Sequence, residues 1–156
     1  VDTDQCGEEE RIFGGSVMNE GEASLALRLV NAFRESFTDK SGKPLEPYVL
    51  SPYAAQVGEI RQKLPDRLRE KCITIYRSQG REYPCVIISF TRNNSGGYIG
   101  FLGGSQYEMK EQTYVGCSRA KAKLVLLLSF DTFMGHGHSE FEALVKTKNA
   151  HIIDRW

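Results

Sequence analysis

Three short stretches carry residue types that could act on phosphates or bind a nucleic-acid strand. They are Ser51-Pro52-Tyr53-Ala54-Ala55-Gln56, Ser78-Gln79-Gly80-Arg81-Glu82 and Tyr114-Val115-Gly116-Cys117-Ser118-Arg119-Ala120-Lys121. A hydroxyl at a helix start favours an anion, a glycine lets the backbone approach a phosphate closely, and an arginine offers a planar fork to phosphate oxygens. Each stretch also has an ordinary explanation, namely a helix cap, a surface turn and an arginine facing the helix dipole.

The motifs of several common enzyme classes are missing from this sequence. There is no G-x-x-x-x-G-K-[ST] phosphate loop, and the three histidines stand in no recognisable catalytic triad. No pair of the four cysteines has C-x-x-C spacing, so we expect small core residues in a reducing compartment rather than a zinc or redox site. His136-Gly137-His138 has no third ligand at suitable spacing and predicts a loop.

Length and composition indicate one globular domain. The 156 residues are 40% apolar and 26% charged, and their net charge is zero. Residues 1–22 nevertheless hold seven acidic side chains and one basic one, whereas residues 61–92 hold eight basic and three acidic ones. The basic segment could neutralise phosphates or simply form a solvated surface. The longest apolar run has five residues and no signal pattern opens the chain, so we expect an intracellular location and no membrane partner.

Strands and helices are expected to alternate along the chain and to position the three stretches. Apolar runs predict strands at residues 48–50, 73–75, 85–90, 123–129 and 151–153. Helical spacing predicts helices capped by Asn19, Ser51, Ser105 and Ser139. This order predicts an α/β fold with a mostly parallel sheet, in which ligands lie at the carboxyl ends of the strands. Residues 1–11 are either a first strand or a frayed end.

Together, the stretches resemble motifs IV, V and VI of superfamily 1 helicases. Residues 51–56 resemble S/T-P-Y-x-x-Q, and Gln79-Gly80-Arg81-Glu82 resembles the Q-G-R-E that precedes a hydrophobic strand in motif V. Val115-Gly116-Cys117-Ser118-Arg119-Ala120 resembles the V-A-L-T-R-A of motif VI. The resemblance covers residues 12–154, and it rests on the order and spacing of the motifs more than on any one of them.

Further residues are similar to two different groups of this superfamily. Gly100-Phe101-Leu102 and residues 16–23 are similar to the G-F-L and S-x-x-N-x-x-E-A of the Up-frameshift and senataxin group. Tyr83-Pro84 and Tyr114-Val115-Gly116 are closer to the UvrD and Rep type. The D-P-R-R-L-N run of the first group is missing, and Glu20 stands where that group has arginine.

The resemblance implies that residues 1–156 form the second, C-terminal motor domain of such a helicase. The fold would be a three-layer RecA-like domain of the P-loop NTPase type. Arg119 would be the arginine finger on the γ-phosphate of ATP, and Gly80 and Glu82 would face the nucleotide across a cleft. A first RecA-like domain of the same polypeptide would supply the phosphate loop and hold most of the Mg²⁺ coordination, so the isolated chain would be nearly inactive.

The same resemblance implies a track for single-stranded DNA or RNA. Ser51, Pro52, Tyr53, Ser78 and Gln79 would lie along the strand. Basic side chains would add contacts to its phosphates: Arg77, Arg81 and Arg92. The alternative is a non-catalytic RecA-like module that binds nucleic acid or protein. The sequence leaves open the choice of RNA or DNA, the polarity of unwinding, and whether the protein acts in nucleus or cytoplasm.

Overall fold

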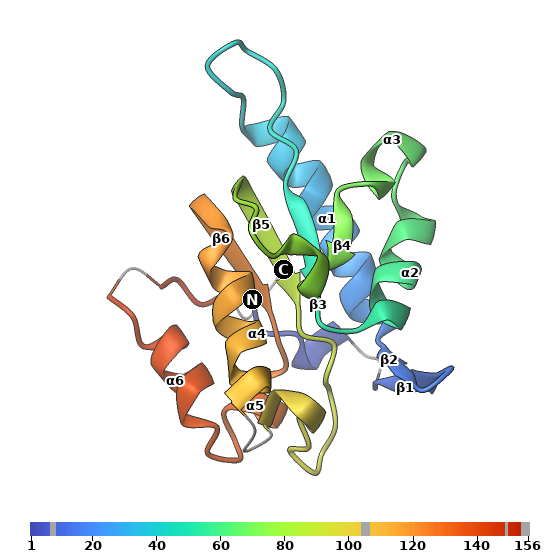
Figure 1. The fold of residues 1–156 in the computed structure, drawn as a ribbon, viewed down its shortest axis with the longest axis vertical. Helices are drawn as coiled ribbons and strands as arrows, with labels where there is room; N and C mark the ends of the chain where they lie inside the picture. The colour runs from blue at the N-terminus through green and yellow to red at the C-terminus, as the bar shows by residue number, and fades with distance from the viewer. Residues whose placement is uncertain (7–8, 104–106, 149, 154–156) are drawn as a thin grey trace.

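A parallel sheet of four strands forms the middle layer of the domain (Figure 1). The computed structural model describes residues 1–6, 9–103, 107–148 and 150–153. The strands β3 (Tyr48–Ser51), β4 (Cys72–Thr74), β5 (Tyr83–Ser89) and β6 (Ala120–Leu127) lie in the order β4-β3-β5-β6. In the interior strand β5 every residue except Pro84 is buried, as its apolar sequence predicts for a strand covered on both faces.

Helices cover both faces of this sheet and complete three layers. On one face, α1 (Glu20–Ser36), α2 (Ala54–Lys63) and the short α3 (Asp66–Arg69) share a core with Cys85 and Ile87 of β5. On the other face, Val86 and Ile88 belong to a second core, against which the end of α4 (Tyr107–Ser118) packs. Successive strand residues point to opposite faces, so one apolar strand serves both cores. The predicted α/β, three-layer RecA-like fold is confirmed.

The end of the second core is built by a cluster of phenylalanines from the C-terminal part of the chain. Phe133 of α5 (Phe130–Phe133) and Phe141 of α6 (Ser139–Val145) are fully buried. Their ring centroids are 4.6 Å apart, and Phe141 meets Phe90 edge-on at 5.2 Å. Such tilted contacts are the favoured aromatic arrangement. They fix α5 and α6 near the segment that follows β5.

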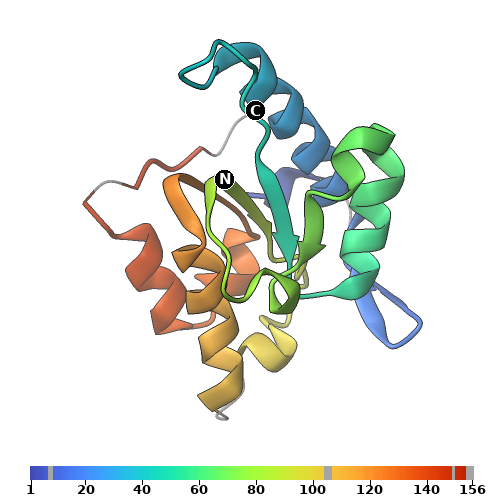
Figure 2. The same ribbon diagram turned by 45° about the horizontal axis from the view of Figure 1, so that its top comes forward.

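The N-terminal segment pairs with the end of β6. Thr3 N donates to Leu128 O at 3.0 Å, and Leu128 N donates to Val1 O at 3.2 Å. Of the two alternatives for this segment, the structure therefore favours a strand-like beginning. A 3-10 turn (Asp4–Cys6) follows, and then the hairpin of β1 (Arg11–Phe13) and β2 (Ser16–Met18). The hairpin projects beside α2 in both views (Figures 1 and 2).

Several predicted boundaries differ from those observed. The helix expected at Ser51 begins at Ala54, because the Ser51 hydroxyl accepts from Tyr53 N at 3.1 Å and forms a turn ahead of the helix. His138, not Ser139, takes the cap position of α6. No strand forms at residues 151–153, although Ile153 O accepts from Asp2 N at 2.9 Å. The predicted cap Ser105 lies outside the described residues.

None of the helices in the described part of the chain is long and apolar enough to cross a membrane.

Candidate functional site

The predicted site residues divide between the two ends of the parallel strands. We call the side where the strands end the carboxyl edge of the sheet and the side where they begin the amino edge. Ser51 ends β3, and Pro52 and Tyr53 follow it, so all three lie at the carboxyl edge, where ligands were expected. Glu82 and Arg119 instead come directly before β5 and β6, whose first residues pair with each other. They therefore lie at the amino edge. The expectation that candidate ligand-binding residues lie at the carboxyl ends of the strands is therefore wrong for Glu82 and Arg119.

At the amino edge, Arg119 joins the end of α4 to the loop before β5. Its Nε donates to Val115 O at 2.9 Å, Nη1 to Arg81 O at 3.0 Å and Nη2 to Ser118 Oγ at 2.8 Å. A guanidinium has five N–H donors, two of them on each terminal nitrogen. Within the described residues, one N–H on each terminal nitrogen is thus left for a ligand. Three hydrogen bonds thus position the Arg119 side chain, and its two remaining N–H groups can bind phosphate oxygens.

Glu82 and Gly80 lie in the loop that Arg119 contacts. Glu82 forms an ion pair with Lys121 at 3.0 Å. The hydrogen bond from Lys121, its charge and the charge of Arg119 hold the pKa of Glu82 below its ordinary value, so this carboxylate is anionic at neutral pH. Gly80 is exposed with φ of +73°, a conformation that side chains disfavour, and open space surrounds its Cα. The structure brings Gly80, Glu82 and Arg119 together at one edge.

At the carboxyl edge, the predicted serine hydroxyls point into the domain. Ser51 Oγ lies 3.2 Å from Thr91 Oγ1, and Ser78 Oγ donates to Ile75 O at 2.6 Å; both serines are fully buried. Tyr53 is 6% exposed, and burial holds its pKa well above the ordinary value. Of the five residues predicted to lie along the strand, Gln79 is exposed and Pro52 is half-buried. Ser51 and Ser78 therefore shape the backbone of this edge rather than present hydroxyls.

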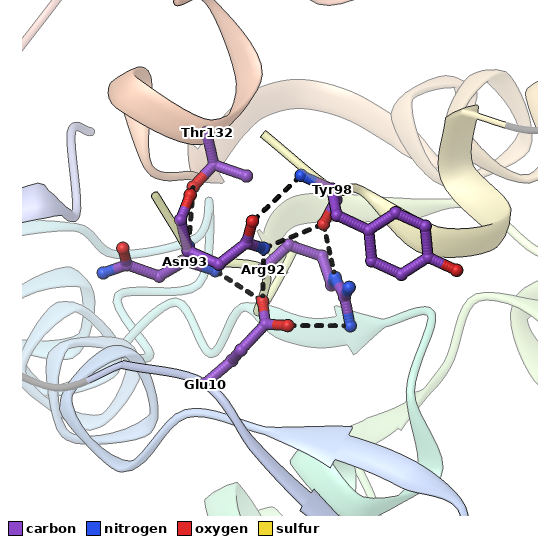
Figure 3. A network of polar contacts seen from close by, with 6 residues as sticks. Glu10, Arg92, Asn93, Tyr98 and Thr132 are labelled. Atoms are coloured by element: carbon purple, nitrogen blue, oxygen red, sulfur yellow. Dashed lines mark hydrogen bonds and ion pairs between the residues drawn. The ribbon is translucent and has the colours of Figure 1, made fainter. Parts of the chain in front are cut away.

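Arg92 is the centre of a polar network at the same edge (Figure 3). Its side chain is only 5% exposed, and Nη1 lies 3.0 Å from Glu10 Oε1. Nε donates to Tyr98 O at 3.0 Å, and the guanidinium lies over the rings of both Tyr98 and Tyr53. The expected contact of Arg92 with strand phosphates is not supported, because its charge is buried and already paired.

Sequence reasoning missed the other members of this network. Glu10 lies 82 residues before Arg92 and carries no local motif, so nothing in the sequence pairs them. Asn94 N donates to Thr132 Oγ1 at 2.9 Å, which connects the loop after β5 to α5. Only the Asn93-Asn94 pair before Gly96-Gly97 signals a turn in the sequence. The long-range contacts follow from the fold, not from spacing.

A buried polar cluster lies beneath this edge and includes Gln56, the last residue of the first predicted motif. Its Nε2 donates to Ser89 Oγ at 2.9 Å, and its Oε1 accepts from Asn19 N at 2.8 Å. Glu22 is fully buried next to this cluster, and its burial raises its pKa to about 8. The nearby Thr91 amide and Ser89 hydroxyl offset part of that shift.

Most of the basic side chains in residues 61–92 are engaged in contacts within the domain. Six of its eight basic side chains are held by ion pairs or backbone carbonyls: Arg61, Lys63, Arg67, Arg69, Lys71 and Arg92. Arg77 and Arg81 are exposed and form no side-chain ion pair with the described residues. These two arginines, on either side of Ser78 and Gly80, are what the segment offers to an anionic ligand.

The site holds no preformed metal centre in the described ranges. No group of three or more His, Cys, Asp or Glu side chains there could bind an ion. His136 and His138 instead contact the backbone oxygens of Asp131 and Gly97, each at 3.0 Å. The predicted loop at His136-Gly137-His138 is confirmed as a turn.

A three-layer RecA-like domain with these motifs at its edges is a superfamily 1 helicase-like domain. The chain belongs to the AAA_12 family, described as an AAA domain, whose model matches residues 1–130. It is 30% identical over 139 residues to DNA-binding protein SMUBP-2 of Rattus norvegicus, which covers 87% of this chain and 13% of that protein.

Two further relatives are named as helicases. DNA replication ATP-dependent helicase/nuclease DNA2 of Homo sapiens is 30% identical over 129 residues, covering 81% of this chain and 11% of that protein. DNA polymerase alpha-associated DNA helicase A of Saccharomyces cerevisiae is 26% identical over 133 residues, covering 83% and 18%. The chain therefore spans less than a fifth of the length of each of these three relatives.

Proposed function

We propose that this chain is the second motor domain of an ATP-dependent superfamily 1 helicase acting on DNA or RNA. The observation that carries the proposal is Arg119, which is fixed against Arg81 O and keeps two N–H groups for a ligand. The helicase names of DNA2 and DNA helicase A support the same class. ATP would lie between this domain and a first RecA-like domain of the same polypeptide.

In this proposal Arg119 acts as the arginine finger. Negative charge on the γ-phosphoryl oxygens is redistributed as the phosphoryl group is transferred to water, and a fixed guanidinium stabilises that charge without reorganising. The bonds to Val115, Ser118 and Arg81 hold the guanidinium in advance. Gly80 and Glu82 would face the nucleotide from the same loop.

Mg²⁺ and the phosphate loop would come from the first domain. The sequence has no G-x-x-x-x-G-K-[ST], and the described residues offer no cluster of metal ligands. The residues of this chain fit the γ-phosphate of ATP but not its metal ion. We therefore expect the 156-residue chain alone to be nearly inactive.

The test is strand-stimulated ATP hydrolysis by the native polypeptide that carries this chain, with Arg119→Ala as the variant. We expect a loss of roughly 10³-fold or more in turnover, with strand affinity nearly unchanged, because Arg119 is not among the residues proposed to lie along the strand. Arg67→Ala, which removes an exposed arginine paired with Glu46, is the control and should keep full turnover. Unchanged turnover in Arg119→Ala would contradict the arginine-finger role.

A second candidate is a non-catalytic module that binds nucleic acid or protein. The observation favouring it is that Ser51, Ser78 and Arg92, three of the residues expected to contact the strand, are engaged inside the domain. In such a module the native polypeptide would bind strands without hydrolysing ATP. The same assay separates the two functions, because only the motor domain predicts turnover that depends on Arg119.

A further inference from the structure

An exposed aromatic ring lies on a rigidly held loop at the carboxyl edge. Tyr98 is 68% exposed, yet its backbone is bound on both sides (Figure 3). Tyr98 N donates to Asn94 Oδ1 at 2.9 Å, and Tyr98 O accepts from Arg92 Nε at 3.0 Å and from Asn94 Nδ2 at 2.8 Å. Core packing does not require this ring, because most of it lies in solvent.

The loop is anchored to the rest of the domain as well as to itself. The Asn94 backbone bonds Thr132 Oγ1 through both its N–H and its C=O, at 2.9 and 3.0 Å. The His136 ring packs so closely on Gly97, where φ is +63°, that an added Cβ would lie 2.0 Å from it. The position of Tyr98 is therefore fixed before any ligand arrives, which reduces the entropy lost on binding.

The Tyr98 ring lies against the Arg92 guanidinium, which in turn lies over the ring of Tyr53. The Arg92 guanidinium lies 4.9 Å from the Tyr98 ring centroid and 6.0 Å from that of buried Tyr53. Its partner Glu10 is itself only 14% exposed, so the pair is held inside the domain. Gly100 allows this packing, since an added Cβ would meet Tyr53 Oη at 3.2 Å. Arg92 thus positions the ring by a cation–π contact and has no free charge for a phosphate.

We propose that Tyr98 is a stacking platform for an unpaired base of a single-stranded nucleic acid. The inference rests on the proposed function only in its requirement for a bound strand. A flat ring held in place among polar and glycine residues suits base stacking, which accepts any base because every base has a π-face. A protein-docking surface would need neighbouring apolar side chains that are exposed. The residues before Tyr98 in the loop are Asn94, Ser95, Gly96 and Gly97, and the apolar Ile99 and Leu102 after it are buried.

The experiment is fluorescence anisotropy of the chain with a labelled twelve-residue oligothymidine and with an abasic strand of equal length and charge. Tyr98→Ala should weaken thymidine binding about 5- to 100-fold, while Tyr98→Phe stays within about twofold because it keeps the ring. On the abasic strand, wild type and Tyr98→Ala should bind equally. The dependence of affinity on salt should not change, since no phosphate contact is lost.

Two further variants keep the test interpretable. Tyr98→Leu keeps apolar bulk but removes the π-face, so it should bind like Tyr98→Ala; if it binds like wild type, the ring serves a general apolar contact and the platform is overturned. Phe13→Ala removes a ring that is equally exposed, at 70%, but on β1, and should keep wild-type affinity. Urea midpoints equal to that of wild type show that each variant is folded.

The remaining outcomes also decide the inference. Equal affinity of Tyr98→Ala and wild type for oligothymidine overturns it, as does an equal loss on the abasic strand. If the wild-type chain binds neither strand at 50 mM salt, the platform is overturned as well. None of these results bears on the arginine-finger proposal, which is judged by ATP turnover of Arg119→Ala in the native polypeptide.

Discussion

Glu22 is a carboxyl group that the domain keeps away from water at the point where α1 meets the end of β5. Its pKa of about 8 arises chiefly from burial, which disfavours the charged form. A neutral carboxyl next to Gln56 and Ser89 can both donate and accept hydrogen bonds, so it suits a buried polar cluster. Ionisation would place an uncompensated charge there.

The stability of the domain should therefore fall as pH rises from about 4.5 toward 8. In this window the unfolded chain has released the Glu22 proton, whereas the folded chain still holds it, because the pKa is raised from 4.5 to about 8. Linkage gives a loss of up to about 1.4 kcal/mol per pH unit and a few kcal/mol in total. Glu22→Gln should remove this dependence and be the more stable form at pH 9, as measured by urea unfolding at pH 5, 7 and 9.

Glu35→Gln provides the control, since this glutamate is exposed on the same helix. It should leave the pH profile as it is in the wild type. A Glu22→Gln profile that is parallel to the wild-type profile would show that Glu22 is ionised in the folded state and would contradict the raised pKa.

Among the elements, those with the strongest local signals were predicted correctly, whereas several helix starts, the last strand and one hairpin were not. Asn19 caps α1 as expected, because a capping side chain acts on an amide only three residues away. The apolar run of β5 was also sufficient to predict a central strand. The β1–β2 hairpin was missed although its Gly14-Gly15 turn is a local signal. The burial of Arg92 could not be predicted, because it depends on the ion pair with Glu10, 82 residues earlier in the chain.

The same contrast holds for the candidate site. Motif order was enough to predict that Gly80, Glu82 and Arg119 come together, although not that they meet at the amino edge of the sheet. The inward direction of the Ser51 and Ser78 hydroxyls, by contrast, has no sequence signal, because a serine motif reads the same whether its hydroxyl points outward or inward.

The cap of α1 offers a test at the level of this element. Asn19 Oδ1 accepts from Glu22 N at 2.8 Å, so Asn19→Ala should destabilise the domain by about 1 kcal/mol for the cap alone. Asn19→Ser keeps a neutral acceptor at the cap and should recover part of the loss. Urea unfolding at pH 7 measures both, and equal stability of all three proteins would exclude the cap as a stabilising feature.

For the molecule as a whole, ion pairs within the domain limit the number of basic side chains that are available to a nucleic acid. Glu46 alone binds both Arg67 and Lys71, at 2.7 and 2.6 Å. A segment that looks strongly basic in the sequence thus becomes a surface with two unpaired arginines within the described residues, Arg77 and Arg81.

Arg77→Ala and Arg81→Ala should each lower the slope of log affinity against log salt for a single strand by about 0.7, the value for one phosphate contact. Arg67→Ala should leave the slope unchanged, because Glu46 already neutralises that arginine. Anisotropy titrations between 50 and 300 mM salt measure all three. If Arg67→Ala lowers the slope as much as the other two, the segment acts through its total charge and not through two defined contacts.

The connection from β4 to β5 runs from the carboxyl edge of the sheet to its amino edge. At one end Ile75 N donates to Ser51 O at 3.0 Å, and at the other Arg81 O accepts from Arg119. Between these ends, Ser78 N donates to Ile75 O at 3.0 Å and Arg81 N donates to Ser78 O at 3.1 Å. A continuous series of hydrogen bonds therefore joins Arg119 to the turn after β3. We expect a movement of Arg119 and Arg81 toward a partner domain to shift that turn through Ser78.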